Sequence, residues 1–205
     1  MHFLLSKILL KFLNTNKIWN LFVGIFIPSI ICSQINNLNF ENLTSKDGLS
    51  QNSVIKIFQD SRNFLWFGTY DGVNRYDGYN FRIYKSVIDD STTLSGININ
   101  SICKDKYGNL WFASLGGGLC KYDRNTETFK RYIYNENFSN SLCSNYIRDL
   151  LFDDYGDLWI ATEQGLDKFN TKTEKFTHFS YDSSNRNSLG SNYLLCLGKD
   201  NYGNI

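Results

Sequence analysis

The sequence is poor in histidine, and its charges nearly cancel. Only two histidines occur among 205 residues, His2 and His178. Metal clusters and nucleophile triads commonly depend on imidazole, so we expect no metal site, no catalytic residue and no cofactor. The 21 basic and 20 acidic side chains give a net charge of +1, which lacks the excess of basic groups typical of nucleic-acid binding. His178, between Thr177 and Phe179, is predicted to lie exposed on an outer strand.

Proline is also nearly absent, with one residue against 15 glycines, 13 tyrosines and 16 phenylalanines. Glycine favours tight turns and aromatic residues favour strands, so this balance indicates many short strands rather than long helices. An all-β fold is therefore expected. The run of glycines at 116–118 is interpreted as a turn, because neither Lys-Ser/Thr nor a helix follows it as in a phosphate-binding loop.

Residues 1–33 have the pattern of a signal peptide. Three lysines precede an apolar run from Ile18 to Ile31, and a polar stretch opens at Ser33. The run is shorter than a spanning helix needs, so we predict a signal-peptide helix, export, and cleavage after Ser33 to leave Gln34 as the first residue. An uncleaved membrane anchor is the main alternative, and a lipid attached at Cys32 is a weaker one.

Export would permit disulfides among the four cysteines that follow the leader. When the repeats described next are superposed, these cysteines fall at four different repeat positions. We therefore interpret them as free thiols: Cys103, Cys120, Cys143 and Cys196.

The dominant feature of the chain is an internal repeat of about 47 residues. Four aspartates mark it at intervals of 45 to 48 residues, and each follows a leucine by eleven positions. Six residues after each of the first three aspartates stands a tryptophan. The aspartates are Asp60, Asp105, Asp153 and Asp200, and the tryptophans are Trp66, Trp111 and Trp159.

Each repeat reads as four short strands, A to D, separated by turn residues, which is typical of a β-propeller blade. Residues 34–205 are thus predicted to form a partial propeller of about three and a half four-stranded blades. The units span about 49–84, 94–132, 142–179 and an incomplete 189–205. Phe40 matches the start of strand D, so we also expect an outer strand there.

The repeated residues have structural roles in this interpretation. Each marker aspartate can close an Asx turn, and a residue that tolerates positive φ follows it: Asn63, Gly108, Gly156 or Gly203. A large flat tryptophan once per blade can fill the layer between neighbouring blades. We therefore expect the marker aspartates and the tryptophans to be structural.

Three motifs stand out between Phe40 and Phe81: D-G-L-S at 47–50, L-W-F-G-T at 65–69 and G-V-N-R-Y-D-G at 72–78. With them this stretch resembles the two-component regulator propeller, and the similarity extends to Ile205. The resemblance implies a periplasmic sensor of carbohydrate fragments or other small ligands, anchored in the inner membrane as part of a hybrid histidine kinase. It also implies, as partners, the remaining blades of a parent propeller and a homodimer of the full-length sensor.

The sequence contains no kinase motif or receiver domain, and it stops where the repeat calls for tryptophan, so we interpret it as a fragment without enzyme activity. Two alternatives stay open. One is a propeller enzyme of the streptogramin-lyase or glycan-cleaving type, and the other is a protein-interaction scaffold.

The repeats differ most in the turns between strands B and C, which should share one face with the connections from D to the next A. Variation on a constant frame suggests a shaped ligand site, and sugars commonly lie on an aromatic ring with polar groups at its edge. The candidate ligand-binding residues are Tyr70, Asp71, Glu163 and Gln164. The A–B turns should face the opposite way.

Overall fold

The computed structural model describes residues 40–205. The predicted signal-peptide helix and the cleavage site after Ser33 lie outside these residues. From Leu43 to Ile205 the chain forms one compact unit. Its one helical element is a single 3₁₀ turn, η2 (Ser45–Asp47), and no helix among the described residues is long and apolar enough to cross a membrane.

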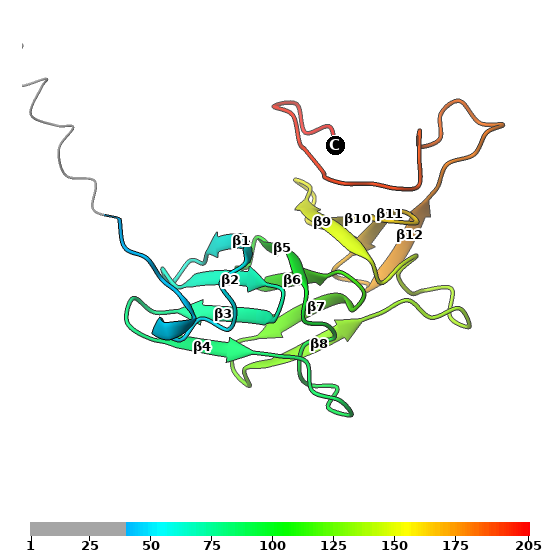
Figure 1. Ribbon diagram of the computed structural model, residues 1–205. Coiled ribbons are helices and arrows are strands. Elements are labelled where there is room, and N and C mark those ends of the chain that lie inside the picture. The colour runs from blue at the N-terminus through cyan, green and yellow to red at the C-terminus, as the bar shows by residue number, and fades with distance from the viewer. Residues whose placement is uncertain (1–39) are drawn as a thin grey trace, which may run out of the picture. The chain divides into compact units, whose positions relative to one another are not determined.

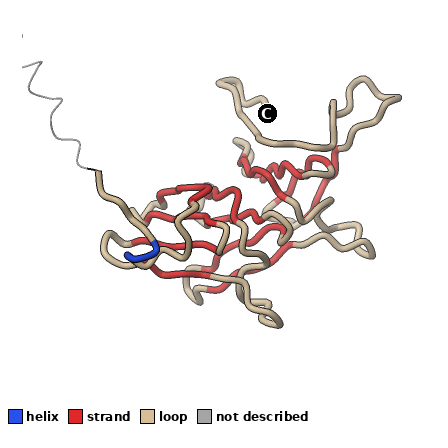
Figure 2. Tube along the Cα trace, in the orientation of Figure 1, coloured by secondary structure: helices blue, strands red, loops and turns tan. Residues whose placement is uncertain are grey.

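The strands form three antiparallel four-stranded sheets, each in simple chain order (Figures 1 and 2). The predicted all-β fold and the four-stranded blades are confirmed. The first blade contains β1 (Val54–Gln59), β2 (Leu65–Thr69), β3 (Gly72–Tyr76) and β4 (Phe81–Tyr84). The second contains β5 (Ile99–Lys104), β6 (Leu110–Ser114), β7 (Gly118–Asp123) and β8 (Thr128–Tyr132). The third contains β9 (Ile147–Phe152), β10 (Asp157–Thr162), β11 (Gly165–Asn170) and β12 (Lys175–Phe179).

The marker aspartates close the turns between the first and second strands. Asp60 Oδ1 accepts hydrogen bonds from the amides of Arg62, at 2.8 Å, and Phe64, at 3.1 Å. The same pair of bonds recurs at Asp105, Asp153 and Asp200. The residues predicted to need positive φ adopt 66° at Asn63, 82° at Gly108, 89° at Gly156 and 86° at Gly203. The turn chemistry predicted from the repeat is present in every copy.

The tryptophans of the first two blades lie in the layers between blades. Trp66 is fully buried and packs on Phe112 and Tyr122 of the second blade, with ring centroids 5.5 and 5.2 Å apart. Trp111 is buried against Phe169 of the third blade in the same way, at 5.8 Å. Each tryptophan is therefore covered by the blade that follows it.

Trp159 of the third blade is only half-buried, and it stacks on Phe179 of its own sheet at 5.6 Å. In each of the three blades a cation from the third strand lies over the tryptophan of the second strand. The distances to the ring are 6.0 Å for Arg75 over Trp66, 5.3 Å for Lys121 over Trp111 and 5.3 Å for Lys168 over Trp159. This cation is a further repeated element, which the marker pattern did not include.

Residues 189–205, predicted to begin a fourth blade, contain the turn at Asp200 but no strand. The segment before this turn runs along the third blade, where Leu197 N donates to Asp149 Oδ2 at 3.0 Å. The first strand of a blade pairs with the second strand. In the three complete blades the second strand begins four or five residues after the marker aspartate, a position that corresponds to Asn204 or Ile205 here. The outer strand expected at Phe40 is not present among the described residues.

Candidate functional site

The turns between second and third strands and the connections between blades meet on one face. Gly72 N donates to Ile97 O at 2.7 Å, which ties the β2–β3 turn to the segment entering the second blade. Gly118 N donates to Asn145 O at 3.0 Å, and this bond ties the β6–β7 turn to the segment entering the third. We name this surface the B–C face. It is the face on which the candidate ligand-binding residues were predicted.

Tyr70 and Asp71 form the tip of the β2–β3 turn on this face. The Tyr70 side chain is half exposed, so its ring is open to a ligand. Asp71 Oδ2 lies 2.6 Å from Lys85 Nζ, and the amide of Asp71 donates to Thr69 Oγ1 at 3.0 Å. The Tyr70 ring thus lies next to the Asp71 carboxylate, which is ion-paired with Lys85 at the end of the outer strand of the same blade.

Glu163 and Gln164 occupy the equivalent turn of the third blade. Glu163 forms an ion pair with Arg148, and Gln164 is exposed. The Arg148 guanidinium also donates to the hydroxyl of Tyr193 at 2.7 Å and lies 5.4 Å from its ring centroid. Glu163 is therefore already bound by a cation, and the surface beside it is aromatic.

The second blade separates these two pairs of candidates. The hydrogen bonds and ion pairs of residues 40–205 link Tyr70 with neither Glu163 nor Gln164, so the four do not form one compact cluster. Two further tyrosines, Tyr146 and Tyr193, are half exposed on the same face. Each precedes its marker aspartate by seven positions, a signal that superposing the repeats would have revealed.

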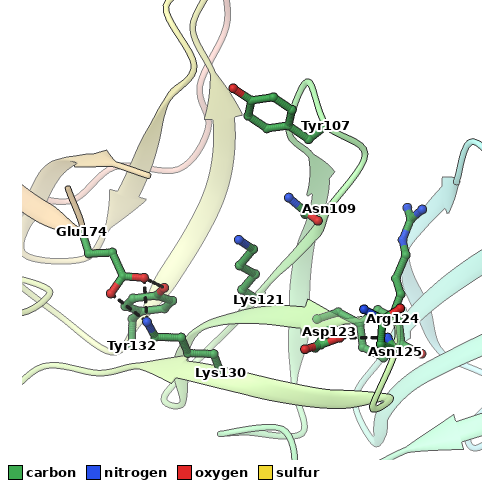
Figure 3. Close-up of a pocket in the computed structure, with 10 residues that line it drawn as sticks. Tyr107, Asn109, Lys121, Asp123, Arg124, Asn125, Lys130, Tyr132 and Glu174 are labelled. Atoms are coloured by element: carbon green, nitrogen blue, oxygen red, sulfur yellow. Dashed lines mark hydrogen bonds and ion pairs between the residues drawn. The ribbon is translucent and has the colours of Figure 1, made fainter. Parts of the chain in front are cut away.

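The opposite side of the blades carries a polar hollow of about 570 Å³ between the second and third blades (Figure 3). Lys130 Nζ bonds both carboxylate oxygens of Glu174, at 2.6 and 2.7 Å, and the hydroxyl of Tyr132 donates to the same carboxylate at 2.9 Å. These bonds, with burial opposing them, lower the pKa of Glu174. The glutamate is thus held ionised as part of a contact between blades, which makes it a poor proton donor.

A third group of reactive side chains lies at the outer part of the third blade. Asp167, fully buried on β11, accepts from the Cys143 amide at 2.8 Å and lies 2.6 Å from His178 Nδ1. Burial raises the pKa of Cys143 to about 12. Burial lowers the pKa of His178, but the bond to Asp167 and its charge outweigh this, so that pKa is raised overall. The four cysteines within residues 40–205 are free thiols, as predicted.

Three segments of the chain match the family model of the two component regulator propeller, at residues 48–71, 93–116 and 141–164. Each segment begins beside the leucine that marks the repeat and ends in the turn on the B–C face. The matched repeat is therefore the one that forms the blades.

The fold is similar to solved extracellular domains of hybrid two-component systems from Bacteroides thetaiotaomicron. One is 31% identical with a TM-score of 0.67, over 75% of this chain and 21% of that domain. Another is 24% identical with the same TM-score, over 83% of this chain and 22% of that domain. The chain thus spans about a fifth of the length of each.

A curated relative, histidine kinase P4 of Formosa agariphila, is 46% identical over 70 residues. That stretch is 34% of this chain and 5% of the kinase. The similarity therefore concerns a small part of a far longer protein.

Proposed function

We propose that this chain, which carries two-component regulator propeller repeats, is a ligand-sensing part of an extracytoplasmic sensor and that its ligand is a carbohydrate fragment. The observation that carries the proposal is the agreement of sequence and fold with extracellular domains of hybrid two-component systems. The proposed location is the periplasm, with the parent protein anchored in the inner membrane. The proposed partners are the remaining blades of the parent propeller and a second copy of the full sensor.

The B–C face supports binding of a polar ring-shaped ligand. Sugars present C–H groups on their faces and hydroxyls at their edges, so they combine stacking on an aromatic ring with hydrogen bonds around it. Tyr70 offers such a ring, and Asp71 offers carboxylate oxygens beside it. Glu163 and Gln164 offer an equivalent polar edge on the third blade. We assign these four residues to ligand contact.

Binding is favoured over catalysis on this face because its carboxylates are paired. Asp71 is held by Lys85 and Glu163 by Arg148. A glycosidase also needs two carboxyl groups about 5 to 10 Å apart on either side of one bond, whereas a whole blade separates Asp71 from Glu163. A paired carboxylate instead accepts hydrogen bonds from hydroxyl groups.

The proposal is tested by calorimetry with cello-, xylo-, manno- and uronic-acid oligosaccharides added to the full chain. We expect one class to bind, and the double variant Tyr70→Ala with Glu163→Ala to weaken that binding by roughly tenfold or more, since a lost hot-spot contact costs at least about 1.4 kcal/mol. The melting temperature should change little, because Tyr70 is half exposed and Arg148 keeps its bond to Tyr193.

The matched control is Tyr107→Ala with Tyr155→Ala. Both rings are exposed, and both stand on turns of the opposite side. This variant should bind as the unmodified chain does. Unchanged affinity in the Tyr70/Glu163 variant would exclude these residues, and no binding by any oligosaccharide class would count against the carbohydrate ligand.

A further inference from the structure

The third blade brings together three side chains of the types that bind transition metals. The Sγ of Cys143, a carboxylate oxygen of Asp167 and a ring nitrogen of His178 lie within 4.8 Å of one another. Cys143 stands in the segment before β9, Asp167 on β11, and His178 directly opposite Asp167 on β12. The cluster forms because Asp167 and His178 are paired across β11 and β12 and because the segment that enters the third blade brings Cys143 beside them.

The equivalent positions of the other blades show that the fold itself does not need these residue types. In the first blade Ser50 N donates to Asn74 Oδ1 at 2.8 Å, and Asn74 Nδ2 donates to Ser50 Oγ at 2.8 Å. In the second blade the amide and hydroxyl of Ser95 contact Cys120 Sγ, at 3.4 and 3.0 Å. A neutral pair thus suffices to connect the segment entering a blade with its third strand.

In the third blade this connection becomes a thiol and a fully buried carboxylate, and the outer strand adds an imidazole where the first blade has Ile83. Burying a carboxylate is costly unless it is paired or binds a metal. A coordination site requires metal-binding side chains at all three positions. The connection between the entering segment and the third strand does not, because the first blade makes it with Ser50 and Asn74.

We propose that Cys143, Asp167 and His178 bind a Zn²⁺ ion. Sulfur, imidazole nitrogen and carboxylate oxygen are the ligands of protein zinc sites, and three of them leave a fourth position for water or an incoming group. In a tetrahedral site with bonds of about 2.0 to 2.3 Å, donor atoms lie about 3.5 Å apart. The donors, which all lie within 4.8 Å of one another, therefore shift on binding, and Asp167 Oδ1 and His178 Nδ1, now 2.6 Å apart, separate by roughly 1 Å. The Cys143 thiol releases its proton to solvent as the sulfur–zinc bond forms, and His178 Nδ1 likewise gives up the proton that it shares with Asp167 as the nitrogen–zinc bond forms.

Surrounding groups already orient two of these ligands. His178 Nε2 lies 3.3 Å from the carbonyl oxygen of Ser139, which leaves Nδ1 facing Asp167 and Cys143. Zinc-binding histidines commonly donate their second ring N–H to such a carbonyl. The Cys143 sulfur lies 3.2 Å from the hydroxyl of Thr162, which is itself fixed by its bond to Gly165 O at 2.8 Å.

The site is open on one side. Asp167 is completely buried, Cys143 is partly exposed, and the His178 side chain is 41% exposed. A metal ion can therefore reach the three donors from solvent, and its fourth position would face outward. This revises the expectation from the sequence, in which the scarcity of histidine argued against a metal site.

The experiment uses the full chain, reduced and freed of metal by chelation, and titrated with ZnCl2 and separately with CoCl2. We expect one ion per chain and, with Co²⁺, a sulfur-to-metal charge-transfer band in the near ultraviolet. Cys143→Ser should abolish the band. It should also lower the affinity by more than the roughly 10- to 100-fold that loss of an outer-shell partner costs.

Two further variants make the outcome decisive. Cys143→Ser with Asp167→Asn reproduces the pair Ser50 and Asn74 of the first blade, so it should fold normally, as judged by circular dichroism, and bind no metal. Cys196→Ser, a change to an exposed thiol, should keep the band and the stoichiometry. A charge-transfer band that survives in Cys143→Ser, or the absence of any stoichiometric binding, would overturn the proposal and leave an ion pair of Asp167 with His178.

Discussion

At the scale of single residues, the marker aspartate accepts a hydrogen bond from the tryptophan six positions later in the first and third blades. Asp60 Oδ2 accepts from Trp66 Nε1 at 3.1 Å, and Asp153 Oδ2 from Trp159 Nε1 at 3.0 Å. One carboxylate thus holds both the turn and the orientation of the ring between blades. The fixed spacing of the two residues in the sequence has this bond as its physical reason.

The second blade breaks this rule. Asn109 Nδ2 donates to Asp105 Oδ2 at 2.7 Å, and among the described residues Trp111 Nε1 finds no acceptor although it is buried. A buried donor without a partner costs about 1 to 3 kcal/mol. The asparagine therefore competes with the tryptophan for the carboxylate.

We predict that Asn109→Phe, which introduces the residue found at Phe64 in the first blade, stabilises the protein by about 1 kcal/mol. Asp105 then becomes free to accept from Trp111. Urea unfolding followed by tryptophan fluorescence measures the change. Asn204→Phe is the control, because Asn204 makes the same bond to Asp200 and no tryptophan among residues 40–205 donates to that carboxylate. A stability gain of equal size in both variants would contradict this explanation.

Asp153 makes stability depend on acid pH. Burial raises its pKa, but the bonds from Trp159 and the backbone, with Lys168 nearby, outweigh burial and lower it overall. A carboxylate whose pKa is lower in the folded state stabilises that state above its unfolded pKa, and this contribution is lost as pH falls through the folded pKa.

We therefore expect the free energy of unfolding to fall below about pH 5 more steeply in the unmodified chain than in Asp153→Asn. Urea titrations at a series of pH values measure the two slopes. Asp154→Asn, at an exposed neighbouring position, should keep the steep slope. Parallel curves for the unmodified chain and Asp153→Asn would contradict the assignment.

At the scale of strands and turns, the third strand of every blade begins at a glycine. Gly72, Gly118 and Gly165 have φ of 98°, 82° and 137°. Each also lies against the outer strand, so that a Cβ at Gly118 would stand 2.7 Å from Tyr132 O. These glycines combine a left-handed conformation with a close approach of two backbones.

Gly118→Ala should accordingly cost roughly 3 kcal/mol of stability, measured by urea unfolding. The control is Gly78→Ala. Gly78 has a similar φ of 100° but no atom within 4 Å of its Cβ position, so only the cost of the left-handed conformation, about 1 kcal/mol, applies. Equal losses in the two variants would show that the contact with Tyr132 is unimportant.

The elements that the sequence could predict are those fixed by short-range chemistry. The turn at Asp60, the blade of four strands and the buried Trp66 all depend on residues a few positions apart, and the repeat displays them three times. The cluster of Cys143, Asp167 and His178 depends instead on strand register and on the return of the chain between blades. Spacing alone shows no relation among these three positions, so the cluster was missed.

The prediction of a ligand site was limited in a similar way. The repeat indicated which turns vary and on which face they lie, but not how far one blade displaces its turn from the next. Tyr70 and Glu163 therefore looked like members of one site, although a whole blade stands between them. Tyr193 was overlooked because it enters the face from the segment that follows the third blade.

At the scale of the molecule, the third blade exposes apolar surface that the first two blades bury. Trp159 is half-buried where Trp66 and Trp111 are covered, and Phe179 is 39% exposed. Leu195, in the segment beyond, is also exposed. Apolar patches of this kind promote association between protein molecules.

We predict that the chain self-associates at micromolar concentration, with a sedimentation coefficient that rises with concentration in analytical ultracentrifugation. Phe179→Glu should reduce this association, because it places a charge within the apolar patch. Phe40→Glu is the control, since Phe40 is exposed but lies outside the blades. A monodisperse monomer over the same range would contradict the prediction.

Trp66 and Trp111 are each buried by the blade that follows them, so we expect the blades to unfold in a definite order. Trp111 keeps its cover only while the third blade is folded, and Trp66 only while the second is. Detachment of the third blade thus uncovers Trp111, while the second blade still has the first blade on its other side. Unfolding should begin at the C-terminal sheet and spread backward, so that amide protons of β9 to β12 exchange first and those of β5 and β6 last.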